Sequence, residues 1–197
     1  MTRLQIAALL IMAAFYAAYF MKMLLQRRKG IQTDQISRGG KPKQVLRVER
    51  WMKIATFSIV PVEVISIVRN LRMWDLPPLR WGGIGMGIIG VLVFILAMAT
   101  MRDSWRAGIP AEDKTELVTT GIYRFSRNPA FLGFDLVYGG LLLAFFNPAH
   151  LIFVLFAAGM LHVQILQEEA FLAEAFADEY LTYKIQTGRY FRIRKYK

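Results

Sequence analysis

The sequence predicts an all-α, polytopic membrane protein with about five transmembrane helices and a cytoplasmic C-terminal amphipathic helix. Of its 197 residues 55% are hydrophobic, and the formal net charge is +11. Soluble domains of this size rarely combine such apolar content with a positive mean hydropathy. Several apolar runs also approach the ~20 residues that a helix needs to cross a hydrocarbon core. We expect residues 1–197 to form a single membrane domain.

Five apolar runs account for the predicted helices, and they cover residues 4–25, 51–68, 81–101, 129–146 and 149–166. The run 81–101 has no charged residue, and 149–166 contains only two histidines as titratable groups. The first run is too long for a secretory signal, and no small-residue cleavage pattern precedes the basic stretch 26–29. We expect it to be retained as an anchor.

Charge placement predicts the topology. Nine Lys or Arg residues lie between positions 27 and 53 against two acids, and five more lie in the last nine residues. The positive-inside rule places both segments in the cytoplasm. The N-terminus, 69–80 and 147–148 then lie outside, while 26–50 and 102–128 lie inside. The basic residues carry no recognised nucleic-acid motif, so we expect no nucleic-acid partner.

Two of the predicted helices carry features of packing. Residues Gly83, Gly87 and Gly90 form a small-residue face that favours close helix contact. The second helix contains Pro61 and the membrane-embedded Glu63. This acid is either functional or structural, and in a structural role it reaches the membrane interface or pairs with Arg69 or Arg72; the structural role is favoured.

The chain has no cysteine and no histidine cluster at ligand spacing, so we expect no disulfide and no metal site.

The stretch before residue 129 carries the first candidate site. Residues Leu117, Val118, Gly121 and Tyr123 offer backbone amides, a glycine and an aromatic face, which suits a flat heterocycle such as adenine. Asn128 is a candidate N-cap and Pro129 a first helical residue. With Arg127 beside it, that helix start either binds a carboxylate or is only a well-capped membrane helix. Gly133 allows a ligand or a helix to approach closely.

Four further side chains complete the candidates. Glu168 and Glu169 follow the last apolar run, and paired carboxylates bind a cationic group or accept a proton. Asp135 lies inside an apolar run and must face the bundle interior, find a partner or take up a proton. Arg106 follows Trp105 at the membrane interface and either anchors the segment or offers its charge to an anionic group.

Residues 121–133, Glu168 with Glu169, and 176–183 together resemble a known signature. It is the C-terminal signature of the isoprenylcysteine carboxyl methyltransferase and phospholipid methyltransferase superfamily, and the resemblance covers about the last 80 residues. Asn128, Phe131 and Ala177 stand where the signature usually has histidine, tyrosine and glycine. The resemblance implies an integral-membrane methyltransferase of a bacterial inner membrane or an endomembrane, with its active site facing the cytoplasm.

The resemblance also implies the ligands and the roles of residues. S-adenosylmethionine is the expected cofactor, and a lipophilic acceptor enters from the bilayer: a phospholipid amine, a prenylcysteine-like carboxylate or a similar group. Residues 1–101 become a packing region and 102–197 the catalytic region. The expected cofactor residues are Leu117, Val118, Gly121, Tyr123, Arg127, Asn128, Pro129, Phe131, Gly133, Glu168 and Glu169. The expected catalytic residues are Glu168, Glu169, Arg189 and Asn128, and the expected acceptor residues are Arg106, Asp135, Tyr183 and Arg189.

Two other functions fit the pattern. An NADPH-dependent membrane ene-reductase of the sterol-reductase type shares a related C-terminal half, but its larger helix count is missing here. A non-enzymatic membrane module that only binds a ligand is the second alternative. The sequence does not predict the oligomeric state.

Overall fold

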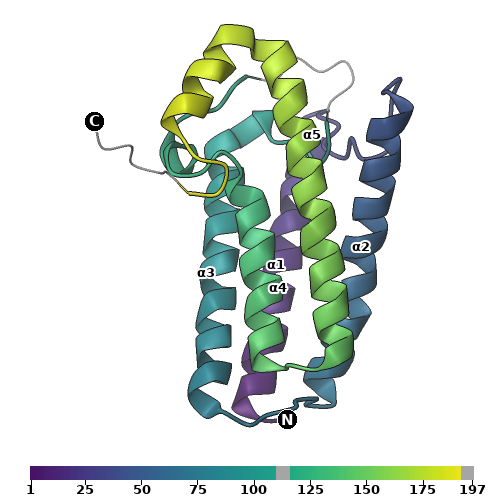
Figure 1. The fold of residues 1–197 in the computed structure, drawn as a ribbon, viewed down its shortest axis with the longest axis vertical. Coiled ribbons are helices and arrows are strands. Elements are labelled where there is room, and N and C mark those ends of the chain that lie inside the picture. The colour runs from purple at the N-terminus through teal and green to yellow at the C-terminus, as the bar shows by residue number, and fades with distance from the viewer. Residues whose placement is uncertain (110–115, 192–197) are drawn as a thin grey trace.

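The protein is a bundle of long helices in a computed structural model, which describes residues 1–109 and 116–191 (Figure 1). Within these residues all regular elements are helices, so the predicted all-α class is confirmed. The elements are α1 (Arg3–Arg28), α2 (Lys43–Val68), α3 (Pro77–Met101), the 3-10 turns η1 (Arg102–Ser104) and η2 (Gly121–Arg124), α4 (Pro129–Ala144) and α5 (Pro148–Gln186).

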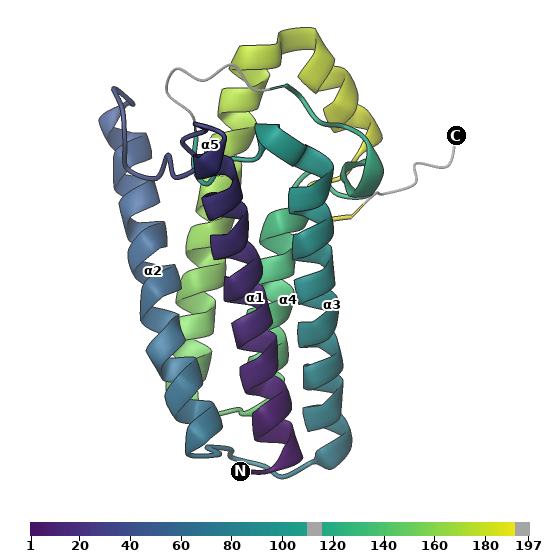
Figure 2. The ribbon, with the colours of Figure 1, turned by 180° about the vertical axis from the view of Figure 1, so that it is seen from behind.

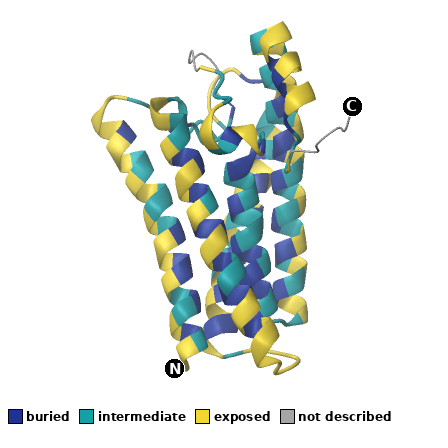
Figure 3. Ribbon diagram, turned by 90° about the vertical axis from the view of Figure 1, so that its left-hand side faces the viewer, coloured by how far each residue is buried: buried dark blue, intermediate teal, exposed yellow. Residues whose placement is uncertain are grey.

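Four helices of the described chain, α1, α2, α3 and α5, are long and apolar enough to cross a membrane. The predicted fifth span corresponds to α4, which is apolar but only 16 residues long. Large apolar side chains such as Leu10, Phe57 and Ile152 are exposed. Exposed positions recur along the outer sides of the helices (Figure 3). A bundle with this surface needs lipid around it, whereas five spans remain a prediction.

The connections alternate between the two ends of the bundle. The N-terminus and the α2–α3 and α4–α5 loops lie at one end, and residues 29–42, 102–109 and the C-terminal part of α5 lie at the other (Figures 1 and 2). This alternation agrees with the threading predicted from charge. We call the second end the site end.

Contact between α3 and α4 organises the core, and glycines make it possible. A Cβ on Gly83 would lie 2.4 Å from the Gly140 carbonyl oxygen, and one on Gly90 would lie 2.8 Å from that of Gly133. These positions have no room for a side chain, so the predicted small-residue face is confirmed as a packing surface.

Glu63 neither reaches the interface nor pairs with Arg69 or Arg72, the two structural roles considered from the sequence. Its carboxylate is completely buried, and its Oε1 lies 4.0 Å from Nε2 of His150 on α5. Arg72 instead forms an ion pair with Asp75 at 3.0 Å. Glu63 points into the bundle, whereas the loop arginines remain at its end.

The loop between α1 and α2 is shorter than expected, because α2 already begins at Lys43. The remaining loop is tied to the segment after α3 by a parallel bridge between Asp34 and Ala107. The fully buried Glu49 carboxylate accepts hydrogen bonds from Lys41 Nζ at 2.8 Å and from the Ile109 amide at 3.0 Å. These contacts hold the loop as a fixed cap over the site end.

The predicted amphipathic helix is the continuation of α5 beyond the membrane run, and it folds over the site end (Figure 1). The backbone leaves the helical region at Ala177, where φ is 41° and ψ is −119°. L-residues rarely adopt a positive φ, so this bend holds Ala177 in a strained conformation. The bend brings the end of α5 back to the start of α4.

Candidate functional site

An ion cluster at the site end joins the two halves of the signature. The Glu169 carboxylate on α5 accepts hydrogen bonds from Arg127 Nη2 at 2.8 Å, Arg189 Nη2 at 2.9 Å and Arg189 Nε at 3.1 Å. The side chains of Arg127 and Glu169 are 7% and 6% exposed, whereas that of Arg189 is 35% exposed. Arg189 is therefore the member of the cluster that a ligand can reach.

Backbone contacts explain why these side chains meet. The Arg127 amide donates to the Gly188 carbonyl at 3.0 Å, and the Arg127 guanidinium also donates to the Thr187 carbonyl. Ser126 Oγ donates to the Arg189 carbonyl at 3.1 Å. Residues 126–127, before α4, are thus hydrogen-bonded to residues 187–189, after α5. Glu169 binds an arginine from each of these two segments.

Opposing effects act on the titration of Glu169, which lies beyond the apolar run that ends at Leu166. Burial raises the pKa of this carboxyl, but the hydrogen bonds and charges of Arg189 and Arg127 outweigh burial, so the pKa lies below its ordinary value. A carboxylate held between two guanidinium groups is ionised near neutral pH and is a poor proton acceptor. The position of Glu169 between the two guanidinium groups suits it to hold both arginines in fixed orientations.

Asn128 was expected to cap α4, and it does so only in position. It is the N-cap residue, but its side chain makes no capping hydrogen bond. Its Nδ2 donates instead to Glu169 Oε1 and to the Arg189 carbonyl, both at 3.2 Å. The amide therefore extends the ion cluster, because its Nδ2 needs acceptors, and the free backbone groups at the start of a helix are N–H donors.

Glu168 and Glu169 were expected to act as a pair, but in the structure the two carboxylates have different hydrogen-bond partners. Glu168 receives a hydrogen bond from Gln164 Nε2 at 3.0 Å and lies within electrostatic range of Glu49 and Lys41. Burial raises the pKa of Glu168 to about 7. Of the two acids, Glu168 is the one whose pKa suits exchange of a proton near neutral pH.

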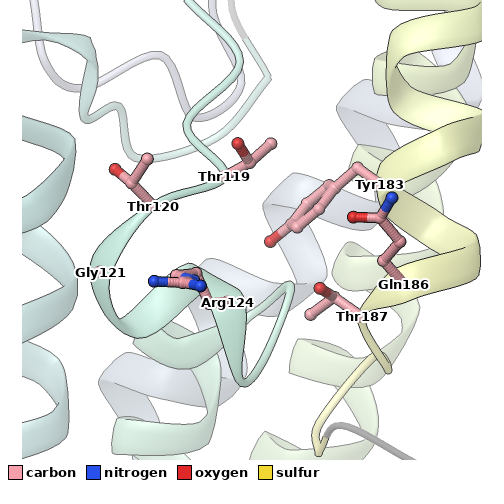
Figure 4. Close-up of a pocket in the computed structure, with 7 residues that line it drawn as sticks. All are labelled: Thr119, Thr120, Gly121, Arg124, Tyr183, Gln186 and Thr187. Atoms are coloured by element: carbon pink, nitrogen blue, oxygen red, sulfur yellow. The ribbon is translucent and has the colours of Figure 1, made fainter.

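Two open cavities flank the segment 119–121. One, of about 350 Å³, is lined by Thr119, Thr120, Gly121, Arg124, Tyr183, Gln186 and Thr187 (Figure 4). Figure 4 shows the Tyr183 ring directed toward η2, where its hydroxyl donates to the Tyr123 carbonyl at 2.7 Å. The other, of about 950 Å³, is lined in part by Arg106, Leu117 and Val118 and shares Thr119, Thr120 and Gly121 with the first.

The remaining predicted residues lie elsewhere. Gly133 packs against α3, where a Cβ would come 2.8 Å from Phe94 Cβ, so of the two approaches expected at this glycine the structure shows that of a helix. Phe131 packs with the cluster between α2 and α5, and Pro129 begins α4. Asp135 is on α4 and its Oδ1 is buried without a hydrogen-bond partner among the described residues.

Sequence reasoning missed several polar residues of this site. Thr119, Thr120, Arg124 and Gln186 line the smaller cavity, and Ser126 joins the backbone pairing. Tyr190 packs on α5, where its hydroxyl lies 2.6 Å from His162 Nδ1. The position of Tyr190 directly after Arg189 was the signal available in the sequence.

Comparison with known proteins supports the resemblance. Residues 83–174, which include Arg127, Asn128 and Glu169, match the sequence model of the Isoprenylcysteine carboxyl methyltransferase (ICMT) family. This match places residues 83–174 in the ICMT superfamily. The predicted relationship is therefore confirmed.

Relatives give the same result. The chain is 33% identical over 104 residues to the protein-S-isoprenylcysteine O-methyltransferase of Saccharomyces cerevisiae (strain ATCC 204508 / S288c), covering 51% of this chain and 44% of the relative. It is 33% identical over 111 residues to a probable protein-S-isoprenylcysteine O-methyltransferase of Oryza sativa subsp. indica, covering 54% and 58%. The chain spans about half the length of the curated relatives it matches.

Proposed function

We propose that this chain is an integral-membrane methyltransferase that moves a methyl group from S-adenosylmethionine to a lipophilic acceptor. The observation that carries the proposal is the convergence of Arg127, Asn128, Glu169 and Arg189 into one hydrogen-bonded cluster at one end of the bundle. These residues come from both halves of the ICMT-like signature, and residues 83–174 match the ICMT family. The names of the relatives support the same activity.

The cavities beside this cluster fit the expected cofactor. The smaller one, about 350 Å³, falls within the usual volume of small-molecule sites. Hydroxyls of Thr119, Thr120 and Thr187 and the Gln186 amide suit the ribose and the adenine edge, and the Tyr183 ring offers an apolar face. Arg124 suits a carboxylate. When bound, S-adenosylmethionine supplies a methyl group on a positively charged sulfur.

The chain contributes to methyl transfer by positioning and desolvation. Transfer requires the acceptor in line with the bond that breaks, and holding both partners in place lowers the barrier without a covalent intermediate. Arg127 and Glu169 are buried and fixed, so Arg189 is held in one orientation by two hydrogen bonds to Glu169. Glu168, which is not part of the ion cluster and accepts a hydrogen bond from Gln164, is available to hold a proton.

We further propose that the acceptor group is a carboxylate of the prenylcysteine type. Arg189 uses Nε and Nη2 on Glu169, and among the described residues its Nη1 makes no hydrogen bond. A guanidinium that is 35% exposed and has both N–H groups of Nη1 available suits an anionic oxygen and disfavours a cationic lipid amine. The basic residues of the α1–α2 loop support a cytoplasmic location for this site.

Calorimetric titration in detergent tests the proposal against its alternatives. We expect S-adenosylhomocysteine to bind and NADPH not to bind. Binding of NADPH alone would support an ene-reductase and would end the methyltransferase proposal. Binding of S-adenosylhomocysteine with no turnover on any lipophilic acceptor would support a module that only binds its ligand.

A second assay tests the acceptor class. Methyl-labelled cofactor is supplied with either an N-acetyl-S-prenylcysteine or phosphatidylethanolamine vesicles. We expect labelled product from the first and none from the second. Label in phosphatidylethanolamine alone would refute the carboxylate proposal while leaving methyl transfer intact.

A further inference from the structure

Buried polar atoms without partners gather inside the bundle, away from the ion cluster. Among the described residues eleven buried side-chain nitrogen and oxygen atoms make no hydrogen bond, and six of them belong to this group. They are Tyr16 Oη, Glu63 Oε1 and Oε2, Asp135 Oδ1, Tyr138 Oη and His150 Nε2. Four helices, α1, α2, α4 and α5, contribute to the group.

These side chains form a continuous series. His150 Nε2 lies 4.0 Å from Glu63 Oε1. The Tyr16 and Tyr138 hydroxyls interact with each other, and both lie within electrostatic range of Glu63. Tyr138 follows Asp135 by three residues on α4, which places both on the same side of that helix.

The two ends of the series face opposite ends of the bundle. Asp135 lies within electrostatic range of Tyr190, the neighbour of Arg189. At the other end, the His150 amide donates to Asn147 Oδ1 at 3.0 Å, in the α4–α5 loop. The series therefore extends along the bundle between the α4–α5 loop and the site end.

Physical chemistry requires partners for these atoms. A separation of 4.0 Å is too long for a hydrogen bond between Glu63 and His150, and no lysine or arginine of the described residues pairs with Glu63. The bilayer offers no polar partner, and an unpaired carboxyl group inside it is costly. Water is the small ligand that satisfies several donors and acceptors at once in polar interiors.

We propose that Glu63, His150, Tyr16, Tyr138 and Asp135 hold a chain of internal water molecules in the bundle, between the α4–α5 loop and the site end. The ligand of this site is water, and the bound waters supply the missing hydrogen bonds. The site does not depend on methyl transfer, so its failure or success leaves the proposed function untouched.

Radiolytic hydroxyl labelling of the purified protein in detergent, read by mass spectrometry, tests this site. Radicals form from water, so a buried ring is modified only where water lies next to it. Tyr138 is 1% exposed and Phe94, in the same bundle, is 0% exposed. We expect Tyr138 to be labelled several-fold faster than Phe94. Equal, near-background labelling of both rings would show that the interior is dry and would overturn the proposal.

A variant removes the water without removing the ring. Glu63→Leu replaces the carboxyl group by an apolar side chain, and we expect Tyr138 labelling to fall several-fold. Ile59→Leu, one turn earlier on α2 and also fully buried, is the matched control and leaves labelling unchanged. Unchanged labelling in Glu63→Leu would contradict the role of Glu63; if that variant fails to fold, the comparison of Tyr138 with Phe94 in the wild type decides.

Discussion

Glu169→Gln removes the charge at the centre of the ion cluster while keeping the shape of the side chain. Glutamine presents one oxygen where the carboxylate has two, so it cannot accept from Arg127 Nη2 and from both nitrogens of Arg189 as Glu169 does. Arg127, only 7% exposed, is then left as a buried cation without a carboxylate. The cluster must either open or hold two like charges together.

The expected cost follows from burial. Breaking a buried ion pair by removing one partner costs ~3–5 kcal/mol, and the 35% exposure of Arg189 places this case near the lower value, at about 3 kcal/mol. For a chain of 197 residues this lowers the midpoint of thermal unfolding by roughly 6–12 °C. Tryptophan fluorescence of the detergent-solubilised protein during heating measures the midpoint.

The matched control is Glu174→Gln, the same substitution at an exposed position of the same helix. We expect it to change the free energy of unfolding by no more than ~0.5 kcal/mol. If both variants unfold at the same temperature, the ion cluster does not hold the site end together and the reasoning is refuted.

Three more predictions follow from the packing and the titration of single residues. Gly140→Ala places a Cβ 2.5 Å from the Gly83 carbonyl oxygen, and we expect it to lower the free energy of unfolding by about 1–3 kcal/mol. Gly159→Ala, which has open space around it, is the control and should cause no such loss. Equal midpoints of thermal unfolding for the two variants would contradict the α3–α4 contact. Ala177→Gly removes the strain of a positive φ, which costs ~1–2 kcal/mol, but it also raises the conformational entropy of the unfolded chain. We therefore expect the free energy of unfolding, measured by thermal unfolding, to rise by about 0.5–1 kcal/mol. A fall would show that the bend is unstrained. Because the Glu168 pKa rises from 4.5 to about 7 on folding, the folded protein binds more protons in that window and its stability falls as pH rises through it. Chemical denaturation at pH 4.5 and pH 7 measures this change in the free energy of unfolding. We expect the change to be smaller in Glu168→Gln than in the wild type, and an equal change in both would show that Glu168 is not its source.

The sequence predicts the parts of the fold that local patterns determine. Apolar runs locate the long helices, Gly83, Gly87 and Gly90 predict the contact with α4, and the charge pattern predicts that the polar segments around Asn128 and Glu169 share one end. In each case the information lies in the spacing of residues along one segment.

The partners of polar side chains could not be predicted, because they depend on how distant segments meet. The Asn128 side chain donates to Glu169 and does not cap α4, Glu63 faces His150, and Glu168 accepts a hydrogen bond from Gln164 and makes none to the arginines that bind Glu169. The smaller cavity likewise depends on the bend at Ala177, a departure from the signature whose strain appears only in the backbone angles.

The most direct test of the central claim is methyl transfer by the purified protein. The protein in detergent is mixed with methyl-labelled S-adenosylmethionine and a lipid extract that contains prenylated cysteine, and the lipid fraction is then treated with base. We predict label in the lipid fraction that base releases as volatile methanol, because a carboxyl methyl ester is hydrolysed. No label in the lipid fraction, with the protein folded and the cofactor bound, would contradict the account.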